Sequence, residues 1–152
     1  MLFTPCPFCH KRIFRPLYAR HRATHTALRP DGQQVDHVTT PPDARYTGPL
    51  DGVPRAYLHP KCNCSTTMPE EIIRSYLVNP FLYSGGSFCV GCKTYVPYDQ
   101  LFWLETNQSL DDYFRQLKQD YLKHHGQPHP TPTANPAPAG LGALATTGRP
   151  PP

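Results

Sequence analysis

The sequence contains no apolar run that approaches the roughly 18 residues needed to span a bilayer. Its opening, MLFTPCPFC, also lacks the apolar core of a secretory signal. These absences predict a cytoplasmic protein without a membrane partner. Apolar material is scarce as well, because only 38% of the 152 residues are hydrophobic and 20 are proline. The chain has room for one ordinary domain or two small ones, and small domains need a metal or another staple for stability.

Acidic residues are absent from the first 30 positions. This stretch carries six basic residues, whereas residues 31–126 hold all 11 acids against eight bases. Clustered positive charge attracts polyanions such as the backbone of DNA or RNA. The basic character belongs to the N-terminal region, where the candidate nucleic-acid-binding residues are Arg12, Arg15, Arg20 and Arg22. A solvated basic helix without a bound polyanion is the alternative.

Six cysteines are many for so short a chain. In a reducing compartment paired cysteines favour metal over disulfides, and a disulfide framework would leave the nearby histidines unexplained. The first candidate ligand set is Cys6, Cys9, His21 and His25. CPFC has the spacing of a zinc knuckle, and two histidines four residues apart share one face of a helix that Pro16 can start.

Residues 4–27 resemble the C2H2 zinc-finger family, and this resemblance implies a ββα unit folded around one zinc ion. The eleven residues between Cys9 and His21 are one fewer than the family's usual gap. Ile13 and Tyr18 stand at the family's two inner apolar positions. The sequence therefore predicts a finger at the N-terminus.

The positions that read bases in DNA-binding fingers hold few polar side chains here. Counted back from His21, they fall on Phe14, Leu17 and Arg20. Only Arg20 can form a bidentate contact with guanine, and one finger covers only about three base pairs. Sequence-specific reading of DNA by this finger is not expected.

A second candidate ligand set lies in the stretches HPKCNC and CVGC. Their pairing resembles a zinc ribbon or treble clef, in which two knuckles meet over one ion. Cys62, Cys89 and Cys92 belong to every sensible set, and the fourth ligand is either His59 or Cys64. We favour His59, because two residues separate it from the next cysteine, as in the other two knuckles.

Each set can fill all four positions of a tetrahedral zinc ion, whereas a catalytic zinc keeps one position open. We therefore expect two structural Zn²⁺ ions as cofactors, no enzymatic activity and no small-molecule substrate.

Composition divides the chain into four regions. These are a C2H2-like finger at residues 1–29, a linker at 30–56, a zinc-ribbon-like domain at 57–126 and a disordered Pro/Ala-rich tail at 127–152.

Two helices are predicted in the zinc-ribbon-like domain. The first covers residues 69–78, with a capping box that starts at Thr67. The second covers residues 110–125, with Ser109 as its cap and Gly126 as its stop. The patterns FLY (residues 81–83) and QLFWL (residues 100–104) indicate strands.

The large aromatic side chains after residue 75 are expected to form the core of this domain, so the predicted fold class is α+β. These features predict a non-enzymatic zinc-binding protein that contacts nucleic acid without strong sequence preference. The alternative is a protein–protein interaction adaptor in which the zinc ions are purely structural.

Overall fold

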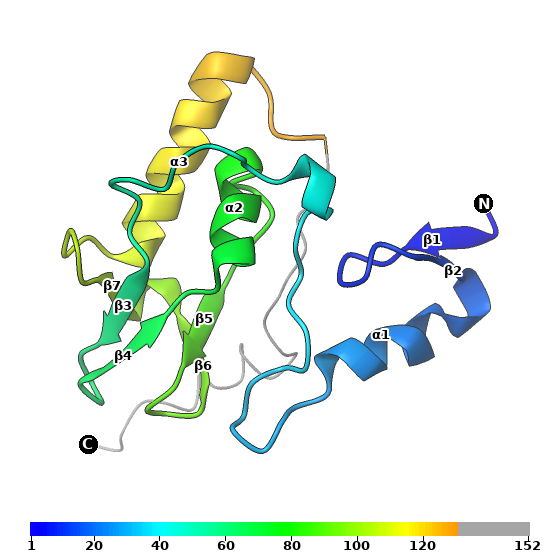
Figure 1. Cartoon of the computed structure of the whole chain (residues 1–152), viewed down its shortest axis with the longest axis horizontal. Coiled ribbons are helices and arrows are strands. Elements are labelled where there is room, and N and C mark those ends of the chain that lie inside the picture. Colours follow the sequence, from blue (N-terminus) through cyan, green and yellow to red (C-terminus); the bar gives the residue numbers. More distant parts are fainter. Residues whose placement is uncertain (131–152) are drawn as a thin grey trace, which may run out of the picture.

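A computed structural model describes residues 1–130, so the part of the predicted tail beyond Pro130 lies outside the described residues. Three α-helices and short antiparallel sheets make up this part of the chain, which confirms the predicted α+β class (Figure 1). The helices are α1 (Tyr18–Thr26), α2 (Glu70–Val78) and α3 (Leu110–His125). The strands are β1 (Phe3–Pro5), β2 (Arg12–Phe14), β3 (Ala56–His59), β4 (Cys64–Thr67), β5 (Gly86–Cys89), β6 (Thr94–Pro97) and β7 (Phe102–Trp103).

Three antiparallel hairpins organise the sheets. β1 pairs with β2, β3 with β4, and β5 with β6, while β7 adds to the free edge of β3. Each hairpin turn contains one of the three predicted knuckles, so strand pairing brings the two ends of every knuckle together. Among residues 1–130, no helix is both long enough and apolar enough to cross a membrane.

The N-terminal region has the expected ββα arrangement. Pro16 lies in a short 3-10 turn, Arg15–Leu17, and α1 follows directly. Pro fits this place because its fixed φ and missing N–H suit the first turn of a helix. No residue of α1 is fully buried, so this helix is held by few apolar contacts.

The C-terminal core consists of aromatic side chains, as predicted. Tyr76 on α2, Trp103 on β7 and Phe114 on α3 are buried, and their rings meet edge to face with those of neighbouring tyrosines. α3 begins and ends as expected, because Ser109 accepts a hydrogen bond from the Asp112 N–H and Gly126 adopts a left-handed conformation.

Two predictions about local structure in this region are wrong. α2 has Pro69 as its N-cap and no side-chain cap, because Thr67 is the last residue of β4 and is paired there with Ala56. Residues 81–83 form no strand. The Asn79 side chain accepts a hydrogen bond from the Phe81 N–H at 3.1 Å, and this turn redirects the chain after α2.

The segment at 30–56 makes far more contacts than the sequence suggests. Figure 1 shows it passing between the finger and α2. Val38 is buried, and its carbonyl accepts a hydrogen bond from Tyr83. The Thr40 N–H donates to the Ser75 hydroxyl, and the Thr39 N–H donates to the Pro7 carbonyl. Backbone and short polar side chains thus connect this segment to both neighbours, although the boundaries of the regions stay a prediction.

Candidate metal centres

The three knuckles share one backbone geometry. In each, the residue directly after the second predicted ligand has a positive φ: 63° at His10, 55° at Asn63 and 56° at Lys93. The N–H of that residue donates to the carbonyl of the first predicted ligand at 2.8 Å in all three turns. HPKC, although it starts with histidine, therefore folds as the two CxxC stretches do. This equivalence supports His59 as the counterpart of the first cysteine in the other knuckles.

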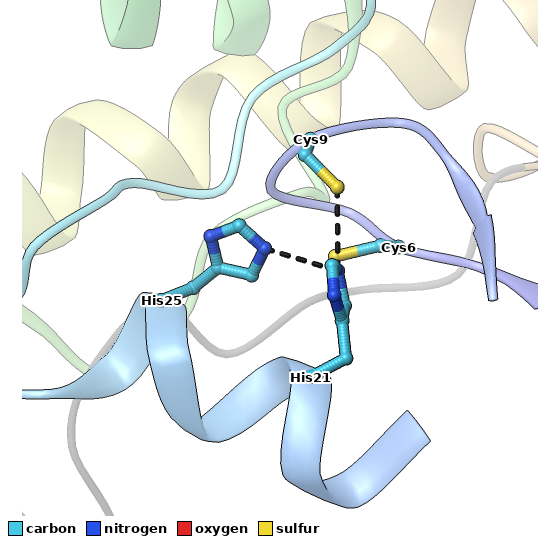
Figure 2. A group of neighbouring side chains, drawn as sticks. All are labelled: Cys6, Cys9, His21 and His25. Carbon is cyan, nitrogen blue, oxygen red and sulfur yellow. Dashed lines mark hydrogen bonds between the residues drawn. The ribbon is translucent and has the colours of Figure 1, made fainter. Parts of the chain in front are cut away.

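The first centre joins the β1–β2 turn to α1. Cys6 and Cys9 come from the turn, His21 and His25 come from successive turns of the helix, and all four side chains converge (Figure 2). The His21 Nε2 atom lies 3.3 Å from the Cys9 sulfur and 3.1 Å from the His25 Nε2. The four predicted ligands of this finger therefore offer one atom each within 4.8 Å of one another.

The second centre joins the β3–β4 turn to the β5–β6 turn. His59 faces the three sulfurs with its Nδ1 atom, at 3.4 Å from Cys62, 3.6 Å from Cys89 and 3.4 Å from Cys92. The Cys62 and Cys89 sulfurs lie 3.5 Å apart. The two centres thus present different ring nitrogens, Nε2 in the first and Nδ1 in the second.

These separations fit the edges of a zinc tetrahedron. With Zn–N bonds of about 2.0 Å and Zn–S bonds of about 2.3 Å, tetrahedral angles give edges of roughly 3.3–3.8 Å. The measured N–N, N–S and S–S separations run from 3.1 to 3.6 Å. Nitrogen and sulfur donors without a carboxylate are the set that zinc prefers in structural sites. Both clusters therefore fit zinc, and each can supply a complete shell of four protein ligands.

The thiols of the second centre influence one another's ionisation. Burial, together with neighbouring sulfurs, raises the pKa of Cys92 to about 11, whereas contacts with the backbone and other thiols lower the pKa of Cys62 against the effect of burial. Three adjacent thiolates repel one another unless a positive ion lies between them. Burial and the Lys61 charge lower the pKa of His59, which favours the neutral imidazole that a metal requires.

Cys64 lies beside the second centre but outside its ligand group. It opens β4, opposite His59 in the strand register. A Cβ atom built on Gly91 would lie 2.5 Å from the Cys64 sulfur and 2.6 Å from the Cys64 Cβ. The Cys64 side chain therefore packs against the knuckle that contains Gly91, and glycine is needed there because any side chain would collide. The structure places His59, rather than Cys64, with Cys62, Cys89 and Cys92.

A second layer of contacts orients the first centre, and sequence reasoning missed it. The His25 Nδ1 bonds to the Asp36 carboxylate at 2.7 Å, and the Phe8 ring stacks on the His25 ring at a centroid distance of 5.0 Å. The Asp36 bond raises the pKa of His25 against the effect of burial, and it fixes the proton on Nδ1 so that Nε2 faces the cluster. The only signal in the sequence for this contact is the position of Asp36, about ten residues after His25.

His10 follows the first knuckle but is not grouped with its ligands. It is half-buried, and its Nε2 lies 3.4 Å from the Thr39 hydroxyl of the following segment.

The four arginines predicted to contact nucleic acid lie on the outside of the finger. Arg12 is in β2, Arg15 is in the 3-10 turn, and Arg20 and Arg22 are on α1; all four are exposed. None of them forms an ion pair with the rest of residues 1–130. Their charges are therefore not neutralised within the described part of the chain.

The chain was compared with protein families, curated proteins and solved structures, and these comparisons assign it no function. No protein-family model, no curated protein and no solved structure matches this chain.

Proposed function

We propose that this protein is a non-enzymatic binding module, stabilised by two zinc ions, whose finger contacts the nucleic-acid backbone without strong sequence preference. The observation that carries the proposal is the set of four exposed arginines in a finger that contains no acid. Unpaired surface cations of this density are the usual means of binding phosphates, since each contact releases condensed counterions.

The absence of an open ligand position supports the non-enzymatic part of the proposal. Each cluster holds four Cys or His side chains, which is enough to close a tetrahedral shell. A zinc ion held this way contributes folding free energy rather than a substrate site.

A charge-matched pair of variants tests the proposal. The test variant changes Arg12, Arg15, Arg20 and Arg22 to Ala, and the control removes four positive charges from the C-terminal region. We expect the test variant to bind unrelated duplex and single-stranded oligonucleotides alike more weakly in gel retardation. The slope of log K against log salt should flatten by roughly 0.7–0.9 per lost phosphate contact. The control, with Arg55, Arg115, Lys118 and Lys123 changed to Ala, should bind like the parent.

An adaptor function is the second candidate, and exposed apolar side chains on the finger favour it. Leu2 is 69% exposed and Leu17 is 55% exposed. Apolar side chains at the outer positions of a finger can contact a protein partner. The same side chains form no hydrogen bonds to base edges, so they disfavour base reading. A parent protein that retards no oligonucleotide at low salt would reject nucleic-acid binding and favour the adaptor.

A further inference from the structure

Two phenylalanines stand exposed on the finger in the midst of its arginines. Phe3 and Phe14 are 45% and 41% exposed, and they are the most exposed aromatic side chains of residues 1–130. They face each other across the β1–β2 hairpin, with ring centroids 5.8 Å apart. The other aromatic side chains of the described chain are buried or half-buried, so Phe3 and Phe14 differ from them in facing solvent.

Strand alternation shows that this face of the hairpin is not used by the core. Phe3 pairs with Phe14 and Thr4 with Ile13 in the strand register. Ile13 is half-buried and packs against the core, so its neighbours in the strands point the opposite way. Arg12 is two residues before Phe14 and therefore lies on the same outward face. The hairpin thus presents two aromatic rings and a cation together to solvent.

The exposed surface formed by Phe3, Phe14 and Arg12, here called the stripe, continues into the helical part of the finger. Phe14, Leu17 and Arg20 are spaced by three residues and are all exposed, and Arg15 lies between the first two. Phe14 ends β2, Leu17 ends the 3-10 turn and Arg20 lies on α1. The outward positions that would read base edges in a duplex therefore carry an aromatic ring, an aliphatic side chain and one cation.

We propose that this surface binds single-stranded nucleic acid, with bases stacked on Phe14 and Phe3 and phosphates held by Arg12, Arg15 and Arg20. The inference rests on the proposed function and names its substrate class. Aromatic rings interleaved with cations are the arrangement that holds single strands, because every base has a face that can stack regardless of its identity. A duplex hides those faces inside its own stack, and a phenyl ring forms no hydrogen bond to base edges in a groove.

Charge complementarity decides between this occupant and a protein partner. Residues 1–30 contain six bases and no acid, so every charged side chain that the finger itself places beside the rings is positive. A strand that alternates planar bases with regularly spaced phosphates matches both features at once. A protein partner would have to supply apolar contacts and acidic side chains in the same register.

Substituting each phenylalanine by leucine tests the inference, because leucine keeps the apolar contact and removes the stacking face. The probes are a labelled 12-nucleotide oligothymidylate and a labelled 12-base-pair duplex, measured by fluorescence anisotropy at one fixed salt concentration. We expect the parent to prefer the single strand. Phe14→Leu and Phe3→Leu should each weaken single-strand binding by about 5- to 150-fold, the range for loss of one stacked base, and leave duplex binding unchanged.

A matched control changes an exposed apolar side chain outside the stripe. Leu104, which is 53% exposed in the C-terminal region, serves this purpose as Leu104→Ala, and this variant should bind as the parent does. Zinc content and circular dichroism of each variant show whether the finger is still folded.

The outcomes separate the inference from the function on which it rests. Equal binding of duplex and single strand, or leucine variants that bind like the parent, would overturn stacking and leave phosphate binding in place. No binding of either probe at low salt would overturn both and favour a protein partner. If one leucine variant fails to fold, the other decides the result.

Discussion

Replacing Gly91 by alanine should weaken the second metal centre without removing any ligand. The Gly91 backbone has an ordinary φ, so the penalty is steric rather than conformational. The added methyl carbon would lie 2.5 Å from the Cys64 sulfur, 2.6 Å from the Cys64 Cβ and 3.0 Å from the Cys62 sulfur. Because Cys62 is a predicted ligand and its sulfur is also crowded, a relaxation of the knuckle that moves Cys62 displaces a zinc-binding atom.

The expected magnitude follows from the size of that movement. Non-bonded carbon contacts are most favourable at about 3.5–4.0 Å, so the neighbours must move by roughly 1 Å. Overpacking of this kind costs about 1–3 kcal/mol. Only the part of this cost that is present with zinc bound and absent without zinc lowers the affinity. The zinc affinity of the second centre should therefore drop by up to about 100-fold. The first centre shares no atom with this clash and should keep its affinity.

Competition with a chromophoric zinc chelator, followed for both zinc ions, measures the effect of Gly91→Ala. Val90→Ala is the matched control, because Val90 is the adjacent residue of the same turn and is 49% exposed. Adding Cys64→Gly to the Gly91→Ala variant removes the atoms in conflict and should restore much of the affinity. Unchanged affinity in Gly91→Ala, or no recovery in the double variant, would refute the packing argument.

The same assay distinguishes the two candidate fourth ligands. Cys64→Ala should retain both zinc ions, and His59→Ala should lose the ion of the second centre, because the His59 Nδ1 faces the three sulfurs. If Cys64→Ala releases zinc while His59→Ala keeps it, the centre has four cysteine ligands and our assignment is wrong.

Two further predictions concern contacts of the segment at 30–56. Asp36→Asn should lower the zinc affinity of the first centre by about 10- to 100-fold, because its carboxylate orients His25; chelator competition checks this, and an equal loss in the surface control Asp31→Asn would contradict it. Tyr95→Phe should lower the free energy of unfolding by about 1–3 kcal/mol, because the buried Gln34 N–H loses its hydroxyl acceptor; an unchanged midpoint in urea would contradict it.

Spacing in the sequence was enough to find the metal clusters. Ligands separated by two residues fold into a tight turn by local geometry, and that geometry proved common to all three knuckles. The preference for His59 came from the same spacing. α3 was predictable for a similar reason, since Ser109 and Gly126 act on the helix ends within a few residues of themselves.

Features that depend on distant partners could not be read from the sequence. Thr67 has the composition of a helix cap, but pairing with Ala56 holds it in β4. The segment at 30–56 looks like a linker because it lacks periodicity. Its contacts are isolated apolar side chains such as Val38, together with backbone and hydroxyl hydrogen bonds, for example from Thr40 to Ser75, and these leave no periodic apolar pattern. Asp36 contacts His25 only after the chain has turned back along α1.

Sequence reasoning placed Phe14 at a base-reading position of the finger, but it did not predict the exposure of Phe3. Phe3 shares the outward face of the hairpin because the strand register pairs it with Phe14. The sequence therefore showed the arginines and Phe14, but not the second ring beside them.

Native mass spectrometry of the whole chain, purified with zinc, counts the metal ions that the two centres hold. Two clusters with four Cys or His ligands each predict two zinc ions per chain, both retained in the folded charge states. A chain that carries one ion, or none, would contradict the assignment of two zinc centres.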